Sequence, residues 1–105
     1  MNKKKYSLKY LPVAANDLKE IVDYIQYTLQ NPIAAENILN KIEQAILERK
    51  KMPESFRKYE SSKKRKYPYY RINVGNFTVW YVVIESTMEV RRILYSRRNE
   101  NNLLA

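Results

Sequence analysis

Arginine is concentrated near the end of the sequence, in the stretch RRILYSRRN, where Arg91, Arg92, Arg97 and Arg98 surround Tyr95. A guanidinium group binds two phosphate oxygens at once, keeps its charge at every physiological pH and stacks on nucleobases. Strict strand alternation would place Arg92 and Leu94 on one face of a sheet, and Arg91, Ile93 and Tyr95 on the other. The stretch is therefore suited to present positive charge to phosphate groups.

A second source of positive charge precedes it. Arg71 begins a predicted strand, and the run KKRK comprises Lys63, Lys64, Arg65 and Lys66. If the strand of Arg71 and the last strand both flank one central strand, we expect Arg71 to lie near the C-terminal arginines, with Tyr95 and this run close by. We predict that the KKRK run and Arg91 bind RNA, with nearby tyrosines stacking on bases. The alternative is that these charges only keep a small protein in solution.

The residue types that are absent limit the chemistry. The 105 residues include no cysteine and no histidine, so disulfides, thiolate metal sites and the usual general base near pH 7 are excluded. Catalysis would have to use carboxylates, tyrosine, lysine or arginine. We expect no metal and no cofactor. The net charge of +9 favours a polyanionic partner, such as nucleic acid or an acidic protein.

No apolar run approaches the roughly 18 to 20 residues that span a bilayer, and the N-terminus lacks the apolar block of a signal peptide. We therefore expect a cytoplasmic protein with no membrane partner. The length predicts one domain, residues 1–105, with a single core.

The first half of the chain predicts a strand and two helices. Apolar and polar residues alternate in KKYSLKYLP, which indicates a half-buried strand that Pro12 ends. From Ala14, apolar residues recur at helical spacing to Leu29, and acidic residues such as Asp17 lie between them. Asn31 is the expected N-cap of a second helix, which runs to about Lys51.

The second half predicts a basic loop and three strands. Residues 50 to 71 contain nine Lys and Arg against two Glu. Strands are expected at 69 to 74, 77 to 85 and 88 to 95, with a tight turn at Gly75 and Asn76. The sequence thus predicts an α+β fold of order β-α-α-β-β-β. Its two helices pack on one face of a small, mostly antiparallel sheet and leave the other face to a ligand.

Four segments in this order resemble one known family. The stretches DLKEIVDYI, NPIAAENILNKIEQAI, YRINVGNFTVWYVV and RRILYSRRN together are similar to the RelE/ParE superfamily of type II toxin–antitoxin toxins, also known as plasmid stabilisation proteins. The likeness covers residues 6 to about 104. It implies a toxin that arrests growth and is neutralised by a cognate antitoxin. The RelE-like branch cleaves mRNA in the ribosomal A site, whereas the ParE-like branch inhibits DNA gyrase.

The resemblance implies roles for particular residues. Arg71, Arg97 and Arg98 fall on basic positions of the ribonuclease pattern, Tyr95 stands where many relatives have histidine, and Asn73 and Thr78 stand where basic residues are common. The arginines would stabilise the charge on a pentavalent phosphate and Tyr95 would act as the acid. The base would be a lysine, a carboxylate such as Glu60, or a group of the ribosome.

Three functions follow from these residues, in order of preference. The first is a toxin that acts as a ribosome-dependent endoribonuclease (mRNA interferase). The second is a gyrase inhibitor without catalytic activity, and the third is a non-toxic RNA-binding module. For a toxin we expect an acidic antitoxin that lies along the helices and sheet. Its apolar contacts would come from the exposed parts of Leu18, Ile25, Tyr27 and Leu39.

Overall fold

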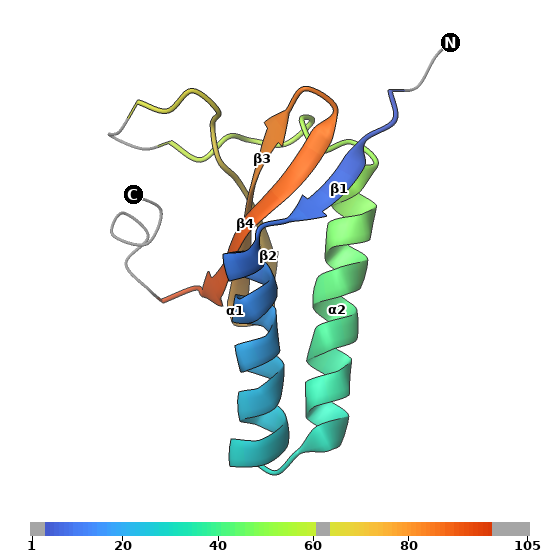
Figure 1. The fold of residues 1–105 in the computed structure, drawn as a ribbon, viewed down its shortest axis with the longest axis vertical. Coiled ribbons are helices and arrows are strands. Elements are labelled where there is room, and N and C mark those ends of the chain that lie inside the picture. The colour runs from blue at the N-terminus through green and yellow to red at the C-terminus, as the bar shows by residue number, and fades with distance from the viewer. Residues whose placement is uncertain (1–3, 61–63, 98–105) are drawn as a thin grey trace.

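The computed structural model describes residues 4–60 and 64–97. The elements follow the predicted order and class (Figure 1). They are β1 (Ser7–Tyr10), α1 (Pro12–Asp23), the π-helix η1 (Tyr24–Thr28), α2 (Pro32–Lys50), β2 (Tyr70–Val74), β3 (Phe77–Ile84) and β4 (Thr87–Tyr95). Among the described residues, none of the helices is both long and apolar enough to cross a bilayer.

The four strands form one mixed sheet of order β1-β4-β3-β2. β1 pairs in parallel with β4, with Ser7 opposite Thr87, and the other two pairings are antiparallel. β2 and β4 both flank β3, which is the condition under which Arg71 was expected near the last strand. This arrangement aligns Arg71 of β2, Trp80 of β3 and Arg92 of β4 in one row across the sheet.

Both helices cover the same face of the sheet (Figure 1). The core lies between the two layers, where α2 contributes Ile42 and Ile46 and the central strands contribute Val79, Tyr81 and Val90, all without exposed surface. The helical spacing and the strand alternation of the sequence supply these apolar faces. The helices therefore cover one face of the sheet, and the row of Arg71, Trp80 and Arg92 lies on the other face.

Local sequence signals account for the ends of the helices. Asn31 caps α2 as predicted, since its side-chain oxygen accepts a hydrogen bond from the backbone N–H of Ala34 at 3.1 Å. The first strand ends before Pro12 as predicted, and the helix begins at Pro12 rather than at Ala14. Proline is favourable as the first helical residue, because the N–H that it lacks would have no partner in the helix. At the β2–β3 turn, Gly75 adopts a φ of +58°, which glycine tolerates at no steric cost.

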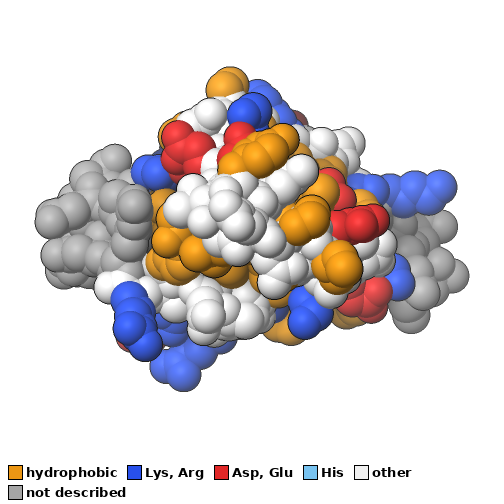
Figure 2. Space-filling model, turned by 90° about the horizontal axis from the view of Figure 1, so that it is seen from below, with side chains coloured by type: hydrophobic (Ala, Val, Ile, Leu, Met, Phe, Trp, Pro, Cys, Tyr) orange, Lys and Arg blue, Asp and Glu red, His pale blue; other side chains and the backbone are white. Residues whose placement is uncertain are grey.

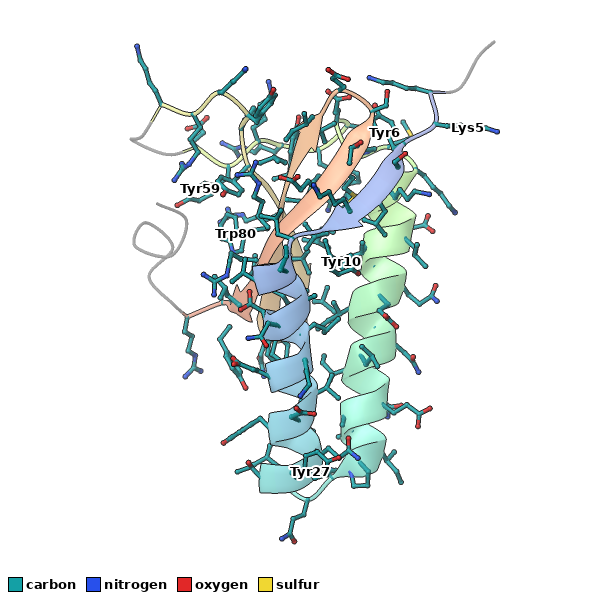
Figure 3. The ribbon with its side chains drawn as sticks, in the orientation of Figure 1. Lys5, Tyr6, Tyr10, Tyr27, Tyr59 and Trp80 are labelled. Atoms are coloured by element: carbon teal, nitrogen blue, oxygen red, sulfur yellow. The ribbon has the colours of Figure 1, made fainter. Side chains whose placement is uncertain are left out.

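The two helices meet at a free end that points away from the sheet. There α1 continues into η1, and a short turn leads to α2. Tyr27 lies at this end (Figure 3), and large apolar side chains remain exposed around it. Seen end-on, hydrophobic and uncharged side chains occupy most of the middle of this surface, with many of the charged ones towards its margin (Figure 2).

Candidate functional site

The face of the sheet opposite the helices is built around Trp80. Its side chain is 1% exposed because three tyrosines from the loop before β2 pack over it and its neighbours Val82 and Leu94. The ring centres of Tyr59 and Tyr69 lie 4.9 and 6.2 Å from that of Trp80, both edge-on. Figure 3 labels Tyr59 and Trp80. The sequence predicted an open face here. In the structure aromatic rings of the basic loop cover part of it, which buries apolar surface that would otherwise contact water.

Arg71 lies beside this aromatic cluster, on the exposed side of β2. Its guanidinium carbon is 5.2 Å from the ring centre of Tyr59 and 5.9 Å from that of Trp80, within the range of cation–π attraction. The backbone is held as well, since Arg49 Nη1 donates to the carbonyl oxygen of Arg71 at 3.2 Å. The positive charge of Arg71 is thus held next to the rings of Tyr59 and Trp80.

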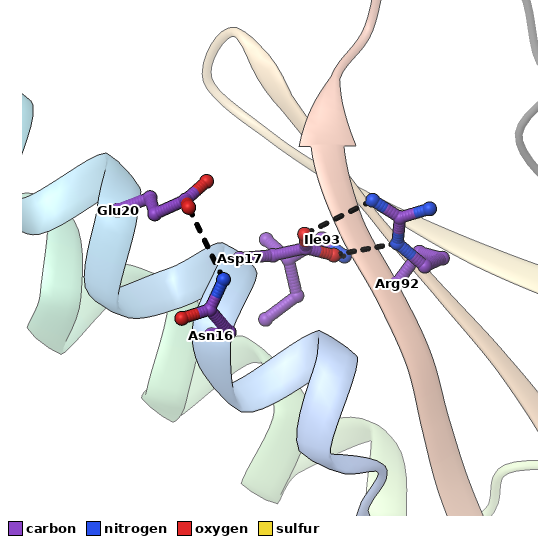
Figure 4. Close-up of polar contacts among 5 residues, drawn as sticks. All are labelled: Asn16, Asp17, Glu20, Arg92 and Ile93. Atoms are coloured by element: carbon purple, nitrogen blue, oxygen red, sulfur yellow. Dashed lines mark hydrogen bonds and ion pairs between the residues drawn. The ribbon is translucent and has the colours of Figure 1, made fainter.

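Arg92 occupies the other end of the row but is engaged by a carboxylate. Its Nε and Nη2 donate to the two oxygens of Asp17 at 2.8 and 3.0 Å, and the backbone N–H of Ile93 donates to Asp17 Oδ2 at 3.0 Å (Figure 4). Both side chains are mostly buried. The Asp17 hydrogen bond is the main cause that raises the pKa of Arg92.

The position of Asp17 follows from the short first strand. β1 ends at Tyr10, which is opposite Val90, so among the described residues no strand pairs with the edge of β4 beyond this point. α1 lies along that edge, and Asp17 satisfies the free N–H of Ile93 in place of a strand. Arg92 therefore neutralises a buried carboxylate, so most of its charge is not presented to a ligand.

Arg91 is the extra residue of a β-bulge. Trp80 pairs with Arg92 and Tyr81 pairs with Val90, so Arg91 has no partner on β3. Its Nε donates to Glu89 Oε2 at 2.7 Å. The bulge interrupts the alternation, so Arg91 does not share the face of Ile93 as strict alternation predicted. The residue expected to bind RNA forms an ion pair with Glu89.

A neutral chain of hydrogen bonds lies at the turn end of the same sheet face. Thr78 Oγ1 donates to Asn73 Oδ1 at 3.1 Å and lies 2.9 Å from Ser96 Oγ. Thr78 is 3% exposed. Asn73 and Thr78 are the positions at which the family resemblance implies basic residues in ribonucleases, so this part of the face carries hydrogen-bonding groups without charge.

Tyr95 lies away from Arg71. Its ring centre is 4.7 Å from that of Phe77, which belongs to the core beneath the helices, so Tyr95 lies on the helix side of the sheet. The prediction that it lies close to Arg71 is wrong, because the two side chains belong to opposite faces. Tyr95 instead helps to line a groove of about 570 Å³ between α1 and the end of β4, together with Asp17, Glu20, Ile21, Tyr24, Ile93 and Leu94.

Arg97 is exposed just beyond β4, whereas Arg98 and Lys63 lie outside the described residues. Of the KKRK run, Lys64 and Lys66 are exposed. Arg65 lies with its guanidinium carbon 5.0 Å from the ring centre of Tyr69. The structure thus brings Arg65 and Arg71 to one aromatic cluster.

Sequence reasoning missed a basic groove at the neck of the loop. The backbone N–H of Tyr59 donates to the carbonyl oxygen of Tyr69 at 2.7 Å and so closes the neck. The groove has a volume of about 650 Å³ and is lined by Phe56, Arg57, Lys58, Tyr59, Glu60, Arg65, Pro68 and Tyr69. Arg57 and Lys58 were not predicted as site residues. The signal that could have found them is the pair of adjacent basic residues between two aromatic residues in FRKY.

The four residues expected to contact an antitoxin differ in exposure. Tyr27 is 68% exposed, whereas Leu18 is 8% exposed and belongs to the core, and Ile25 packs partly against it. Leu18 and Leu39 line a shallow groove of about 250 Å³ between α1 and α2. Leu18 therefore offers little surface to a partner, and Tyr27 offers the most.

Among the residues in 4–60 and 64–97, no group of three or more acidic side chains is placed to hold a metal ion. Lysine and arginine outnumber carboxylates among the described residues of the loop, where Glu54 and Glu60 are the acidic side chains, so this region is positively charged.

One comparison with a solved structure supports this fold, and a second gives a weaker superposition. A chain of the chromosomal ParDE TA system from P. aeruginosa superimposes with a TM-score of 0.73 at 19% identity, over 88% of this chain and 97% of that chain. A chain of the RelB-RelE antitoxin-toxin complex from Methanococcus jannaschii gives a TM-score of 0.44 at 20% identity, over 83% and 88% of the two chains. No curated protein matches the chain.

The family comparison covers most of the sequence. Residues 8–100 match the sequence profile of the ParE toxin of the type II toxin-antitoxin system, parDE. This span includes both helices, the π-helix and strands β2 to β4 in full, and all of β1 except Ser7. The chain therefore belongs to the ParE toxin family of type II toxin–antitoxin systems.

Proposed function

We propose that this toxin arrests growth by binding DNA gyrase, without a catalytic step of its own. The observation that carries the proposal is the neutral hydrogen-bonded chain of Asn73, Thr78 and Ser96 on the sheet face. RNA cleavage by the neighbouring 2′-hydroxyl needs a base, an acid and several positive charges around one phosphate. A binding toxin needs only a complementary surface.

Two further placements support a binding role. Glu89 neutralises Arg91, and Asp17 neutralises Arg92. The sheet face therefore presents less positive charge than the number of its arginines implies. Tyr95, the expected acid, lies on the other side of the sheet from Arg71. In this proposal the toxin contacts an anionic surface of its target with the basic groove and Arg71.

Ribosome-dependent mRNA cleavage is the second candidate. The observation in its favour is the groove at the loop neck, where Arg57, Lys58 and Arg65 stand among aromatic side chains. Cationic grooves with aromatic walls bind single-stranded nucleic acid by phosphate contacts and base stacking. The ribosome would then have to orient the RNA and supply the missing proton acceptor.

One experiment separates the two candidates. Toxin freed from its antitoxin is added to purified gyrase with relaxed plasmid, and separately to a translating extract whose mRNA 5′ ends are mapped. Loss of supercoiling with intact mRNA is the expected result. Cuts within translated codons, with normal supercoiling, would replace the proposal by the second candidate.

The groove is tested by a charge-matched pair of variants. Replacing Arg57 and Lys58 by alanine should weaken inhibition at least tenfold. The control replaces Lys5 and Lys41, which are exposed and outside the groove, and lowers the net charge equally. We expect the control to change inhibition less than threefold, because long-range attraction between exposed charges is screened by salt. Equal losses in both variants would mean that only net charge matters.

The charge distribution suggests how the antitoxin binds. The helical hairpin, residues 12 to 50, contains four basic and six acidic residues. Its net charge is −2, whereas the rest of the sequence has a net charge of +11. We propose that an acidic antitoxin segment contacts the loop and sheet, whereas an apolar segment covers the groove of Leu18 and Leu39. Electrostatic attraction would then guide the acidic antitoxin segment to the loop and sheet only.

A further inference from the structure

The free end of the helical hairpin has an unusual composition for this chain. Residues 24 to 35, YIQYTLQNPIAA, contain no charged residue, although 30% of the whole sequence is charged. Four of their large apolar side chains are exposed, namely Tyr24 by 46%, Tyr27 by 68%, Leu29 by 54% and Ile33 by 73%. We call these four residues the apolar tip.

The backbone holds the apolar tip in one shape. Leu29 N–H donates to the Tyr24 carbonyl and Asn31 N–H to the Ile25 carbonyl, both at 3.0 Å. Gln30 turns the chain with a φ of +52°, and the Asn31 cap starts α2. π-helical turns such as η1 are rare and frequently mark functional sites. A surface fixed in this way loses little conformational entropy when it is covered.

We propose that the apolar tip is the contact surface between two copies of this toxin. A second copy fits because of where the charge lies. The basic loop and the N-terminal lysines lie at the opposite end of a molecule whose longest dimension is 46 Å (Figures 1 and 3). Tip-to-tip contact therefore separates the strongly positive ends of two copies by several times the Debye length of about 8 to 10 Å. Contact through the basic ends would bring like charges together.

The exposed area sets the strength of this contact. With roughly 200 Å² for each of these four large residues, two aromatic and two aliphatic, the exposed fractions leave about 500 Å² of largely apolar surface on each copy. Two copies would bury about 1,000 Å² in total, which is at the lower end for a specific interface. The same patch on both copies gives a closed two-fold dimer. We expect a reversible dimer with a dissociation constant in the micromolar range.

The test is sedimentation velocity of the antitoxin-free toxin from about 1 μM to 1 mM. Tyr27→Glu and Ile33→Glu should each raise the dissociation constant at least tenfold, because they place like charges in an apolar contact. Both sites are more than two-thirds exposed, and circular dichroism checks that the fold is retained. Met52→Glu is the matched control, since Met52 is 61% exposed, lies outside the apolar tip and should leave the dimer unchanged.

Each other outcome overturns the proposal. A wild-type chain that stays monomeric up to 1 mM would exclude self-association. A dimer that survives both tip substitutions, or that Met52→Glu disrupts, would place the contact elsewhere. If the chain is monomeric and the tip substitutions weaken capture by the antitoxin, the apolar tip belongs to the antitoxin interface.

Discussion

Replacing Asp17 by asparagine should destabilise the fold strongly, although the change is nearly isosteric. The carboxylate accepts three hydrogen bonds, two from Arg92 and one from the N–H of Ile93. Asparagine has one acceptor oxygen, and its NH₂ group would face the donors of the guanidinium. The variant therefore loses at least one charged hydrogen bond in a site where Asp17 is 8% exposed.

The magnitude follows from these contacts. A hydrogen bond to a charged group contributes about 1.5 to 3 kcal/mol, so we expect Asp17→Asn to lower the free energy of unfolding by about 2 kcal/mol. For a domain of this size that loss lowers the melting temperature by about 8 to 16 °C. Arg92→Met should cost about 3 kcal/mol, because it leaves a buried carboxylate without its counter-charge. The double variant should cost less than the sum, with a coupling of about 1.5 kcal/mol.

Urea denaturation followed by circular dichroism measures all four members of this cycle. Asp23→Asn serves as the control, because it is the same substitution in the same helix at a pair that is exposed, 2.6 Å from Lys19. An exposed pair of this kind contributes no more than about 1 kcal/mol. If Asp17→Asn costs no more than Asp23→Asn, or the coupling is below about 0.5 kcal/mol, the assigned role of Asp17 is refuted.

Three further predictions concern the pH dependence of stability, the role of Tyr95 and the binding of the antitoxin. Burial raises the pKa of Tyr81 above 10.0. The neutral phenol therefore stabilises the fold below pH 10, and this stabilisation is lost as the pH rises through the pKa of the folded state. Tyr81→Phe should make the free energy of unfolding fall less steeply at alkaline pH. Tyr95→Phe should retain toxicity in a growth assay, and full loss would restore Tyr95 as a catalytic acid. Raising salt should slow association with the antitoxin more than it speeds dissociation, as measured by surface plasmon resonance. If salt instead increased the dissociation rate more than it slowed association, the proposal that an apolar antitoxin segment holds the complex together would be wrong.

The sequence predicted the elements well because their signals are local. Helical spacing, strand alternation and the asparagine–proline start of α2 each depend on neighbouring residues, and the structure confirms them. The turn at Gly75 also follows from adjacent positions. A fold class is then determined by the order of the elements and the faces that they must bury.

The site was harder to predict because its decisive contacts are distant in sequence. Asp17 is one of the polar residues of its helix, and the sequence around it does not indicate a buried contact. It accepts a hydrogen bond from Ile93, 76 residues later, because β1 ends at Tyr10 and leaves that N–H without a strand partner. The bulge at Arg91 depends on the register of two strands, which alternation within one strand does not reveal. The groove exists because Tyr59 bonds to Tyr69 and closes the loop, a contact that composition cannot indicate.

The pairing of β1 with β4 affects when the sheet can form during synthesis. Ser7 pairs with Thr87, so the first strand is completed only by the last, across 79 intervening residues. Contacts between such distant residues slow folding, because the loop between them must close first. While the last strand is still inside the ribosome, Asp17 also lacks Arg92 and Ile93. The nascent chain therefore cannot complete its sheet, or satisfy the buried Asp17 carboxylate, until residues 87–93 have left the ribosome.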